Sequence, residues 1–306
     1  MKSGRKTEGL FIFSTLAPIA FFLLVLSVSP ILYNVYISTT NMSLYHYDSY
    51  DFVGLFNYIT IFTSPVSDFF RVGLWNVVYS VVSIAVPFII GVLAASALTR
   101  TPRFISATAL PLMILPWVVP AFITILIWKG LFNYNFGAIN LILERLGLSK
   151  TPWLMDPNLA RLSVIAVSVW LGIPFMTTMA TGIIRTIPNG VMEAARIDGA
   201  GPIAIFTSFT FPLVTRRMIP VLVMGFSASF NNFTAIYLLT AGGPTSPGSI
   251  GGAGSTDIII SYIFKLTLQS RRYGLAAAYA VIVFVAIGII TLYNLGWIRR
   301  GREEVF

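Results

Sequence analysis

Cysteine is absent from this 306-residue sequence, which excludes disulfide bonds, thiolate nucleophiles and cysteine-ligated metal centres. Histidine occurs once, at His46, so a cluster of histidine metal ligands is excluded as well. Charged residues are scarce and make up 10% of the chain, against about 25% in a typical soluble domain. So few ionisable groups offer little from which to build a set of catalytic acids and bases, and the composition therefore argues against an enzyme.

Apolar residues are correspondingly abundant in the sequence. They make up 56% of the sequence, and such a chain cannot hide all of its apolar surface in one water-soluble core. We therefore expect the lipid bilayer to be part of its solvent. The formal net charge of +9 is not by itself evidence for nucleic-acid binding, because its meaning depends on where the basic residues lie.

Six apolar runs are long enough to cross a bilayer, which takes about 20 residues in a helix. None has a Lys, Arg, Asp or Glu in its apolar centre. The first run is too long for a signal peptide and lacks a small-residue cleavage site, so we expect a retained helix. The sequence predicts an all-α, polytopic membrane protein with a single domain over residues 1–306. The six predicted spans are 10–36, 72–98, 104–128, 162–184, 218–240 and 274–298.

The distribution of basic residues predicts the orientation of the spans. With the N-terminus inside, the inner segments carry well over half of the basic residues and fewer than half of the acidic ones. Six spans return the C-terminus to the inside, where Arg299, Arg300 and Arg302 lie. Both termini are therefore expected in the cytoplasm. Topology accounts for the basic excess, so no nucleic acid is expected as a partner.

The predicted outer segments are longer than simple turns. The segment from Phe52 to Phe70 has apolar residues at helical spacing and is predicted to form a short helix along the membrane surface. Residues 133–161 form a mixed loop, and residues 241–255 are rich in Gly, Pro and Ser.

The most informative segment is the polar loop from residue 185 to 217, which lies between the fourth and fifth spans. Pro188 and Asn189 predict the start of a helix, with Asn189 as its cap and Glu193 near its positive end. Gly199 predicts a left-handed stop, and a second helix is expected to start near Pro202 and lead into the fifth span. Such a short helix can either transmit a partner's motion to both spans or simply rest on lipid headgroups.

A spacing within this loop resembles a known motif. Glu193-Ala194-Ala195 is followed by Gly199 six positions after the glutamate and by Pro212 thirteen further on. This pattern resembles the EAA loop of ABC importer membrane subunits, the cytoplasmic element that docks into a separate ATPase. The resemblance implies that this loop couples the spans to that ATPase. The implied coupling residues are Glu193, Ala194, Ala195, Arg196, Asp198, Gly199 and Ala200.

Other segments narrow the resemblance to carbohydrate importers. Trp170-Leu171-Gly172, Phe230-Asn231-Asn232-Phe233 and residues 273–278 are similar to the larger membrane subunit of maltose/maltodextrin importers. The extra N-terminal helices and the large inserted periplasmic domain of that subunit are missing, as in compact permeases for trehalose, maltose and glycerol phosphate. The resemblance implies a multi-pass permease in a prokaryotic plasma (inner) membrane. Its cargo would be a di- or oligosaccharide such as trehalose or maltose.

The same resemblance suggests a substrate site in the middle of the membrane. Leu171, Gly172 and Asn232 match lining residues of the family, while Ser168, Phe175 and Ser229 fall at lining positions but differ in type. An amide such as Asn232 can bond sugar hydroxyl groups, and an aromatic ring can cover a sugar face. The same side chains can equally join neighbouring helices. Gly172-Ile173-Pro174 is expected either to interrupt the fourth span and line a cavity or to kink its helix.

Two other classes of protein are weighed against an importer. An ion-coupled secondary transporter usually needs an ionisable group at membrane depth, and none lies in the predicted span centres. An intramembrane enzyme would need a convergent catalytic set, which the composition disfavours. The sequence also lacks a G-x-x-x-x-G-K-[ST] nucleotide motif, so ATP and Mg²⁺ are expected only on a partner. The implied partners are a second, homologous permease, two ATPase subunits and an extracytoplasmic sugar-binding protein.

Overall fold

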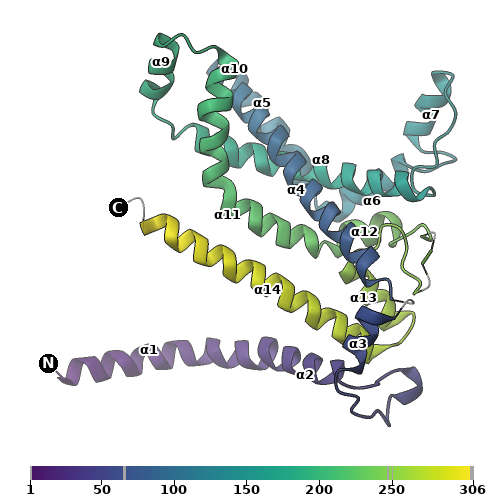
Figure 1. Cartoon of the computed structure of the whole chain (residues 1–306). Coiled ribbons are helices and arrows are strands. Elements are labelled where there is room, and N and C mark those ends of the chain that lie inside the picture. The colour runs from purple at the N-terminus through teal and green to yellow at the C-terminus, as the bar shows by residue number, and fades with distance from the viewer. Residues whose placement is uncertain (1, 65–66, 247, 250, 304–306) are drawn as a thin grey trace. The chain divides into compact units, whose positions relative to one another are not determined.

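The computed structural model of the chain consists of helices joined by loops (Figure 1). It describes residues 2–64, 67–246, 248–249 and 251–303, with all side chains in these ranges except those of residues 2–12, 103, 189, 191–192, 290 and 293–303. Within these ranges, extended backbone pairs only at two isolated bridges, between Thr40 and Phe52 and between Thr245 and Gly254. The helical fold class predicted from the sequence is confirmed.

The helices follow one another along the chain with mostly short connections. In order they are α1 (Lys2–Leu23), the π-helical η1 (Leu24–Val28), α2 (Ser29–Ser38), the 3-10 helix η2 (Leu44–His46), α3 (Phe56–Thr63), α4 (Phe69–Arg100), α5 (Arg103–Val118), α6 (Ala121–Leu131), α7 (Ala138–Arg145), α8 (Pro157–Ile184), α9 (Asn189–Ile197), α10 (Pro202–Ile205), the π-helical η3 (Phe206–Thr210), α11 (Phe211–Phe230), α12 (Phe233–Thr240), α13 (Ile259–Leu268) and α14 (Tyr273–Glu303).

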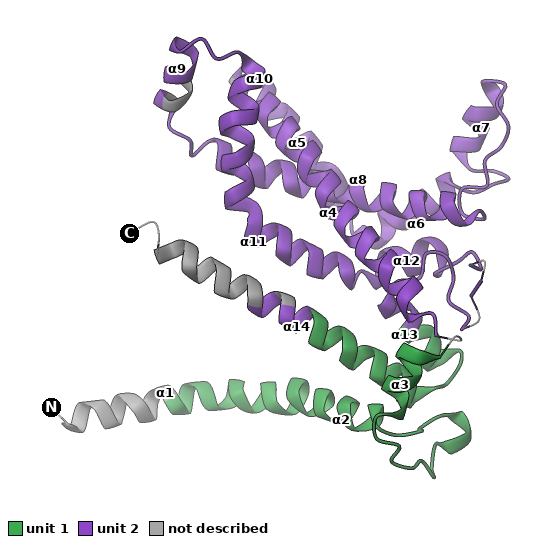
Figure 2. Ribbon diagram, viewed as in Figure 1, with its two compact units in different colours: residues 1–64, 263–286 green, residues 65–262, 287–306 purple. Residues whose placement is uncertain are grey.

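Two compact units make up the chain (Figure 2). The first comprises residues 1–64 and 263–286, and the second comprises residues 65–262 and 287–306. All residues predicted to couple to an ATPase or to bind a sugar lie in the second unit. The expectation of one membrane domain over the whole chain stays a prediction.

Both π-helical segments precede a proline by two residues. The segment η1 ends at Val28 before Pro30, and η3 ends at Thr210 before Pro212. A proline has no amide N–H to donate, and its ring clashes with the carbonyl group four residues earlier. One widened turn ahead of the proline relieves that clash and lets the helix continue.

The first unit is held together by contacts between chain segments far apart in sequence. The buried amide Nδ2 of Asn57 in α3 donates to the carbonyl oxygens of Ser38 and Thr40, at 2.9 and 2.8 Å. The backbone N–H of Gly274, at the start of α14, donates to the carbonyl of Met42 at 2.9 Å. A side chain at position 274 would collide with the carbonyl oxygen of Thr40, so only glycine allows this close approach.

The core of the second unit forms where α4 packs along α8. Small residues allow the two helices to approach closely, as is common between helices in membranes. A Cβ atom added at Gly91 would lie 2.7 Å from the Cβ of Met176, and one added at Gly172 would lie 2.9 Å from the Cγ of Pro87. Buried clusters occupy the two ends of this contact: Trp75, Tyr79, Ile125, Phe132, Val164, Val167, Ala235, Ile236, Leu239 and Ile258 at one end, and Phe88, Val92, Ala95, Met176, Ala180, Val214 and Met218 at the other.

A Gly91→Leu substitution is expected to destabilise the protein by about 1–3 kcal/mol, because the new side chain would overpack the contact with Met176. The melting temperature of the detergent-solubilised protein measures this effect. Gly182→Ala is the matched control, since no heavy atom lies within 4 Å of a Cβ at that helical position. Equal melting temperatures for Gly91→Leu and the wild type would contradict the packing of α4 on α8.

Several helices are apolar and long enough to cross a membrane. Among the described residues, Phe13–Ser38, Phe69–Arg100, Pro157–Ile184 and Pro202–Phe230 meet this condition alone, and α5 with α6 meets it as a pair. The predicted spans at 10–36, 72–98 and 162–184 thus each coincide with one such helix. The described apolar part of α14, Tyr273–Ile289, is shorter, so the exact number of six spans and the sides of the two termini stay predictions.

The third and fifth predicted spans are not continuous helices. The run at 104–128 bends by 85° between α5 and α6, where Val119 is extended ahead of Pro120. A residue before a proline avoids the helical conformation, which explains the location of the break. The run at 218–240 breaks at Asn231 and Asn232, between α11 and α12.

The expected interruption of the fourth span is wrong. The helix α8 continues from Pro157 to Ile184 through Gly172-Ile173-Pro174. Its tight packing along α4, with Gly172 against Pro87, supports a continuous helix on both sides of Pro174. Gly172 therefore serves the contact between two helices and does not open a turn in the backbone.

Candidate functional site

The predicted coupling segment contains one short helix, α9, with a well-defined end. Gly199 has a φ of +81°, the left-handed conformation expected for it. The backbone N–H of Gly199 donates to the carbonyl of Arg196 at 3.0 Å, and that of Ala200 donates to the carbonyl of Ala195 at 2.9 Å. These two bonds form a Schellman motif, which satisfies carbonyl groups that the end of a helix otherwise leaves free.

The start of α9 differs from the prediction. The helix begins at Asn189 with Pro188 as its N-cap, so Asn189 is the first helical residue and not the cap. Its side chain lies outside the described residues. Glu193 falls in the second turn of the helix, because the helix begins earlier than expected, and it therefore gains little from the positive helix end.

The surface of α9 is mostly open to solvent. Glu193, Ala194, Arg196 and Asp198 are exposed, and the side chain of Ile197 is 86% exposed. Ala195 is only 6% exposed, so Ala194 is the accessible one of the two alanines, and the coupling role implied for both stays a prediction.

Past Gly199 the chain turns and enters a long helical segment, as predicted. Pro202 occupies the first turn of α10, and η3 and α11 continue the helix without a break to Phe230. Arg216 and Arg217 lie midway along this segment and are exposed, and Nη1 of Arg217 donates to Oγ1 of Thr186 next to the end of α8. The apolar helix long enough to cross a membrane is Pro202–Phe230, so it begins and ends earlier in the chain than the predicted fifth span at 218–240.

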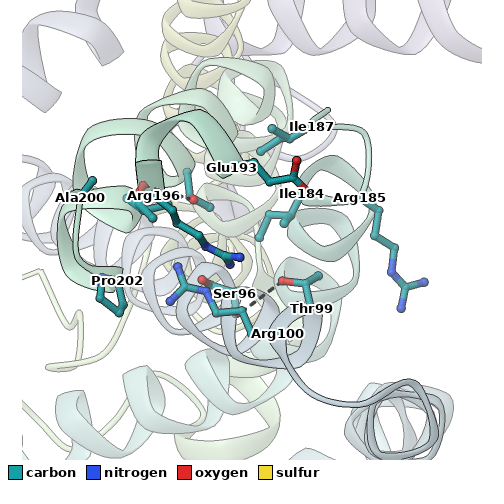
Figure 3. A pocket seen from close by; sticks show the side chains of 12 residues that line it. Ser96, Thr99, Arg100, Ile184, Arg185, Ile187, Glu193, Arg196, Ala200 and Pro202 are labelled. Atoms are coloured by element: carbon teal, nitrogen blue, oxygen red, sulfur yellow. Dashed lines mark hydrogen bonds between the residues drawn. The ribbon is translucent and has the colours of Figure 1, made fainter. Parts of the chain in front are cut away.

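A cavity of about 830 Å³ lies between α9 and the neighbouring helix ends (Figure 3). Arg100, at the end of α4, and Arg196, on α9, point toward the same part of it, while Arg185 points away. Glu193 is the one acidic side chain among its described lining residues. The remaining lining is mixed, with the hydroxyl groups of Ser96, Thr99 and Thr210 and the apolar side chains of Ile184, Ile187 and Ile205.

Four of the predicted substrate residues share one face of α8. Ser168, Leu171, Gly172 and Phe175 recur at intervals of three and four, so their side chains line the same stripe. Leu171 packs against the buried cluster around Tyr79, and the ring of Phe175 lies 5.9 Å from that of Trp117. All four residues are half-buried, and Leu171, Gly172 and Phe175 act in packing in this structure.

Ser168 and Asn232 meet around the hydroxyl group of Tyr79. The Tyr79 hydroxyl lies 2.9 Å from Oγ of Ser168, and the side chains of Asn232 and Ser83 also lie close to it. Oδ1 of Asn232 accepts the backbone N–H of Ala235 at 3.2 Å and so caps α12. Ser229 lies one turn earlier, and its carbonyl oxygen accepts the backbone N–H of Asn232 at 3.1 Å.

Tyr79 and Ser83 were missed by the sequence analysis. Both are buried, and Oγ of Ser83 has no hydrogen-bond partner among the described residues. A signal was present, because Asn76, Tyr79, Ser80 and Ser83 place polar groups on one face of an otherwise apolar helix. The result is an uncharged polar cluster formed by α4, α8 and the break between α11 and α12.

Each of the two broken spans interrupts the backbone hydrogen bonds of its helix within an apolar segment. At the end of α11, Nδ2 of Asn76 donates to the carbonyl of Phe230 at 3.1 Å, and Nδ2 of Asn231 donates to that of Ser227 at 3.1 Å. At the end of α5, Trp117 and Val118 are exposed, with exposed fractions of 56% and 70%. Broken backbone within the bilayer is tolerated only against protein or water, so the exposed break cannot face lipid.

The geometry of these sites suits the binding of a solute or a partner protein more than the making or breaking of covalent bonds. No group of three or more His, Asp or Glu side chains that could hold a metal ion occurs in the part of the chain that the structure describes. The clustered hydroxyl and amide groups can bond a neutral polar solute, and the exposed α9 offers a contact to a partner.

Residues 87–300, more than half of the chain, match the family described as "Binding-protein-dependent transport system inner membrane component". The chain belongs to this family. The resemblance to ABC importer permeases is therefore confirmed, and the chain is a multi-helix membrane permease subunit. Permease subunits of this family are not themselves enzymes.

Curated relatives of the permease are sugar transport proteins. It is 38% identical over 293 residues to the "Galactooligosaccharides transport system permease protein GanP" of Bacillus subtilis, a match that covers 94% of this chain and 70% of that protein. It is 38% identical over 248 residues to the "Maltose/maltodextrin transport system permease protein MalF" of Salmonella typhimurium. That match covers 79% of the permease but only 48% of the relative, so the chain spans about half the length of that protein.

Solved structures of ABC transporters share the fold of the permease. A chain of a bacterial ABC transporter involved in the import of the acidic polysaccharide alginate aligns with a TM-score of 0.80 at 20% identity, covering 98% of the permease and 99% of that chain. A chain from the bacterial alginate ABC transporter in complex with an alginate pentasaccharide-bound periplasmic protein aligns with a TM-score of 0.79 at 21% identity, covering 96% of each.

Proposed function

We propose that this permease is one membrane subunit of an ATP-driven importer for an oligosaccharide, and that it forms half of the translocation pathway. The loop at residues 185–217 couples the pathway to a separate ATPase. The observation that carries the proposal is the position of α9, an exposed helix held between the adjoining ends of α8 and α10–α11. A force applied to α9 acts on both of these long helices at once.

The partners follow from this arrangement. The chain supplies no nucleotide motif, so ATP and Mg²⁺ belong to two ATPase subunits that contact Glu193, Ala194, Arg196 and Ile197. A second, homologous permease covers the exposed residues Val119 and Asn231 at the two breaks and completes the pathway. An extracytoplasmic sugar-binding protein delivers the cargo, and the complex lies in a prokaryotic plasma membrane with the α9 side in the cytoplasm.

The polar cluster around Tyr79 is the proposed contact for the sugar. Hydroxyl groups of Tyr79, Ser83 and Ser168 and the amide of Asn232 offer donors and acceptors without charge. Such a set suits a neutral oligosaccharide better than an acidic polysaccharide, which would call for basic side chains. The galactooligosaccharide and maltose/maltodextrin relatives agree with a neutral cargo. The unpaired Ser83 hydroxyl would gain a partner when the sugar binds.

The proposal is tested by purifying the permease with its ATPase, second permease and binding protein, and by screening sugars for stimulation of ATP hydrolysis. A neutral di- or oligosaccharide presented by the binding protein is expected to stimulate hydrolysis. Stimulation by an acidic oligosaccharide alone would contradict the assignment of the cargo. Failure to recover any ATPase with the permease would contradict the coupling role.

Tyr79→Phe is expected to raise the KM for sugar uptake about five- to tenfold, because one hydrogen bond of about 1 kcal/mol is lost. Recovery of the ATPase should not change. Phenylalanine keeps the buried ring, so the fold should survive. Tyr237→Phe, on an exposed side chain of α12, is the control for loss of a hydroxyl group.

Asn232→Ala is expected to lower uptake more than it lowers ATPase recovery, because it removes both a polar group from the cluster and the cap of α12. Asn232→Ser separates the two roles, since serine also caps helices but cannot reproduce the amide. Uptake kinetics are measured for both variants. Restoration of normal uptake by serine would assign Asn232 to helix capping alone.

A further inference from the structure

The cavity beside α9 carries more positive than negative charge, because its described lining includes Arg100, Arg185 and Arg196 against the single acidic side chain of Glu193. The guanidinium groups of Arg100 and Arg196 come from different helices and point into the same space (Figure 3). Neither forms an ion pair or hydrogen bond within the described part of the chain. Each lies at the C-terminal end of its helix, where the dipole supplies roughly half of an opposite charge. Hydrogen-bond donors of both guanidinium groups are therefore available to an anion that enters the cavity.

The walls of the cavity suit an amphiphilic anion better than a free one. Hydroxyl groups of Ser96 and Thr99 lie on the α4 side, and Ile184, Ile187 and Ile205 form apolar surface. Because α4 and α8 are long enough to cross the membrane, Arg100 and Ile184 lie at the level of the lipid headgroups. The volume of about 830 Å³ exceeds what a single phosphate ion needs.

We propose that this cavity binds the headgroup of an anionic phospholipid, with the phosphate between Arg100 and Arg196 and the glycerol end against the isoleucines. Basic cavities between membrane helices on the cytoplasmic side bind such headgroups in other proteins. A bound lipid would tie α9 to the end of α4 and would hold the coupling helix in place. That consequence for transport rests on the proposed function, whereas lipid binding itself does not.

The alternative occupant is an acidic segment of the ATPase, because Arg196 also belongs to the predicted coupling surface. The lipid is favoured by the apolar wall that Ile184, Ile187 and Ile205 form. Glu193 also lines the cavity. Its carboxylate would repel an acidic protein segment as readily as a lipid phosphate, so it does not distinguish between these two occupants. Removal of the Arg100 side chain distinguishes the two occupants, because it would weaken retention of the lipid in one case and binding of the ATPase in the other.

The full-length permease is purified in detergent, and bound phosphatidylglycerol and phosphatidylcholine with the same acyl chains are counted by native mass spectrometry. The wild type is expected to retain phosphatidylglycerol in preference to phosphatidylcholine. Arg100→Gln is expected to weaken this retention about fivefold, and the double variant with Arg196→Gln to weaken it further. Arg216→Gln is the control, since it removes one exposed positive charge that lines a different cavity.

Two results would overturn the proposal: equal retention of phosphatidylglycerol by the double variant and the wild type, or displacement of the lipid by an equal concentration of inorganic phosphate. Loss of ATPase binding in Arg100→Gln with unchanged lipid retention would assign the cavity to the ATPase instead. Lipid retention is measured on the permease alone, so a failure to recover an ATPase would count against the proposed function and not against the lipid site.

Discussion

Replacing Gly199 with valine is expected to leave the permease in the membrane while reducing ATPase recovery and sugar uptake at least tenfold. Position 199 has a φ of +81°, and a β-branched residue in that conformation costs about 1–2 kcal/mol. The two hydrogen bonds that close α9 would weaken as well, at about 1 kcal/mol each. Since α9 then loses its defined end, the ATPase would meet a displaced surface.

The expected cause is backbone strain and not collision, because no atom lies within 4 Å of a Cβ at Gly199. Gly199→Asn is therefore the matched control: asparagine adopts the left-handed conformation more readily, and its effect should be much smaller. Membrane insertion, ATPase recovery and uptake are measured for both variants. Equal loss in the two variants would show that added side-chain bulk, and not the backbone conformation, causes the defect.

The second large effect is expected for Glu193→Lys, which should reduce the amount of ATPase recovered with the permease more than tenfold. Glu193 is exposed and forms no ion pair with the side chains that the structure describes, so its replacement should not disturb the permease itself. When a partner covers it, reversal of its charge places like charges together in a desolvated interface, which costs several kcal/mol. Co-purification of the ATPase at low and high salt measures the effect.

Glu144→Lys is the control for charge reversal. Glu144 is also exposed, and its ion pair with Lys150, at 3.3 Å, is of the surface type that contributes little. It lies in α7, in the predicted outer loop and far along the chain from α9. An equal loss of ATPase in both variants would remove the special role assigned to Glu193.

Helical periods and apolar runs predicted the long helices well, because a run such as residues 72–98 allows few alternatives to a helix. They could not predict where a span bends. Val119-Pro120 breaks its helix whereas Pro174 does not, although both lie in apolar runs. The difference depends in part on neighbours distant in sequence, because Gly172, just before Pro174, packs against Pro87 of α4.

The candidate sites show the same limit. The motif located α9 and its end at Gly199, since both depend on local sequence. It did not predict that Ala195 would be buried, because burial depends on the approach of other segments. Likewise, the family resemblance pointed to Ser168 and Asn232 as residues of the substrate site. It did not point to Tyr79, which brings them together from a helix about 90 residues earlier than Ser168.

The most direct test of the central claim is the energy source of uptake. The purified transporter is reconstituted into proteoliposomes, and entry of a labelled neutral oligosaccharide is measured with ATP on the α9 side or with a proton gradient alone. Uptake is expected only with ATP and only when the ATPase subunits are present. Uptake driven by the proton gradient without ATP would contradict the account and would favour an ion-coupled transporter.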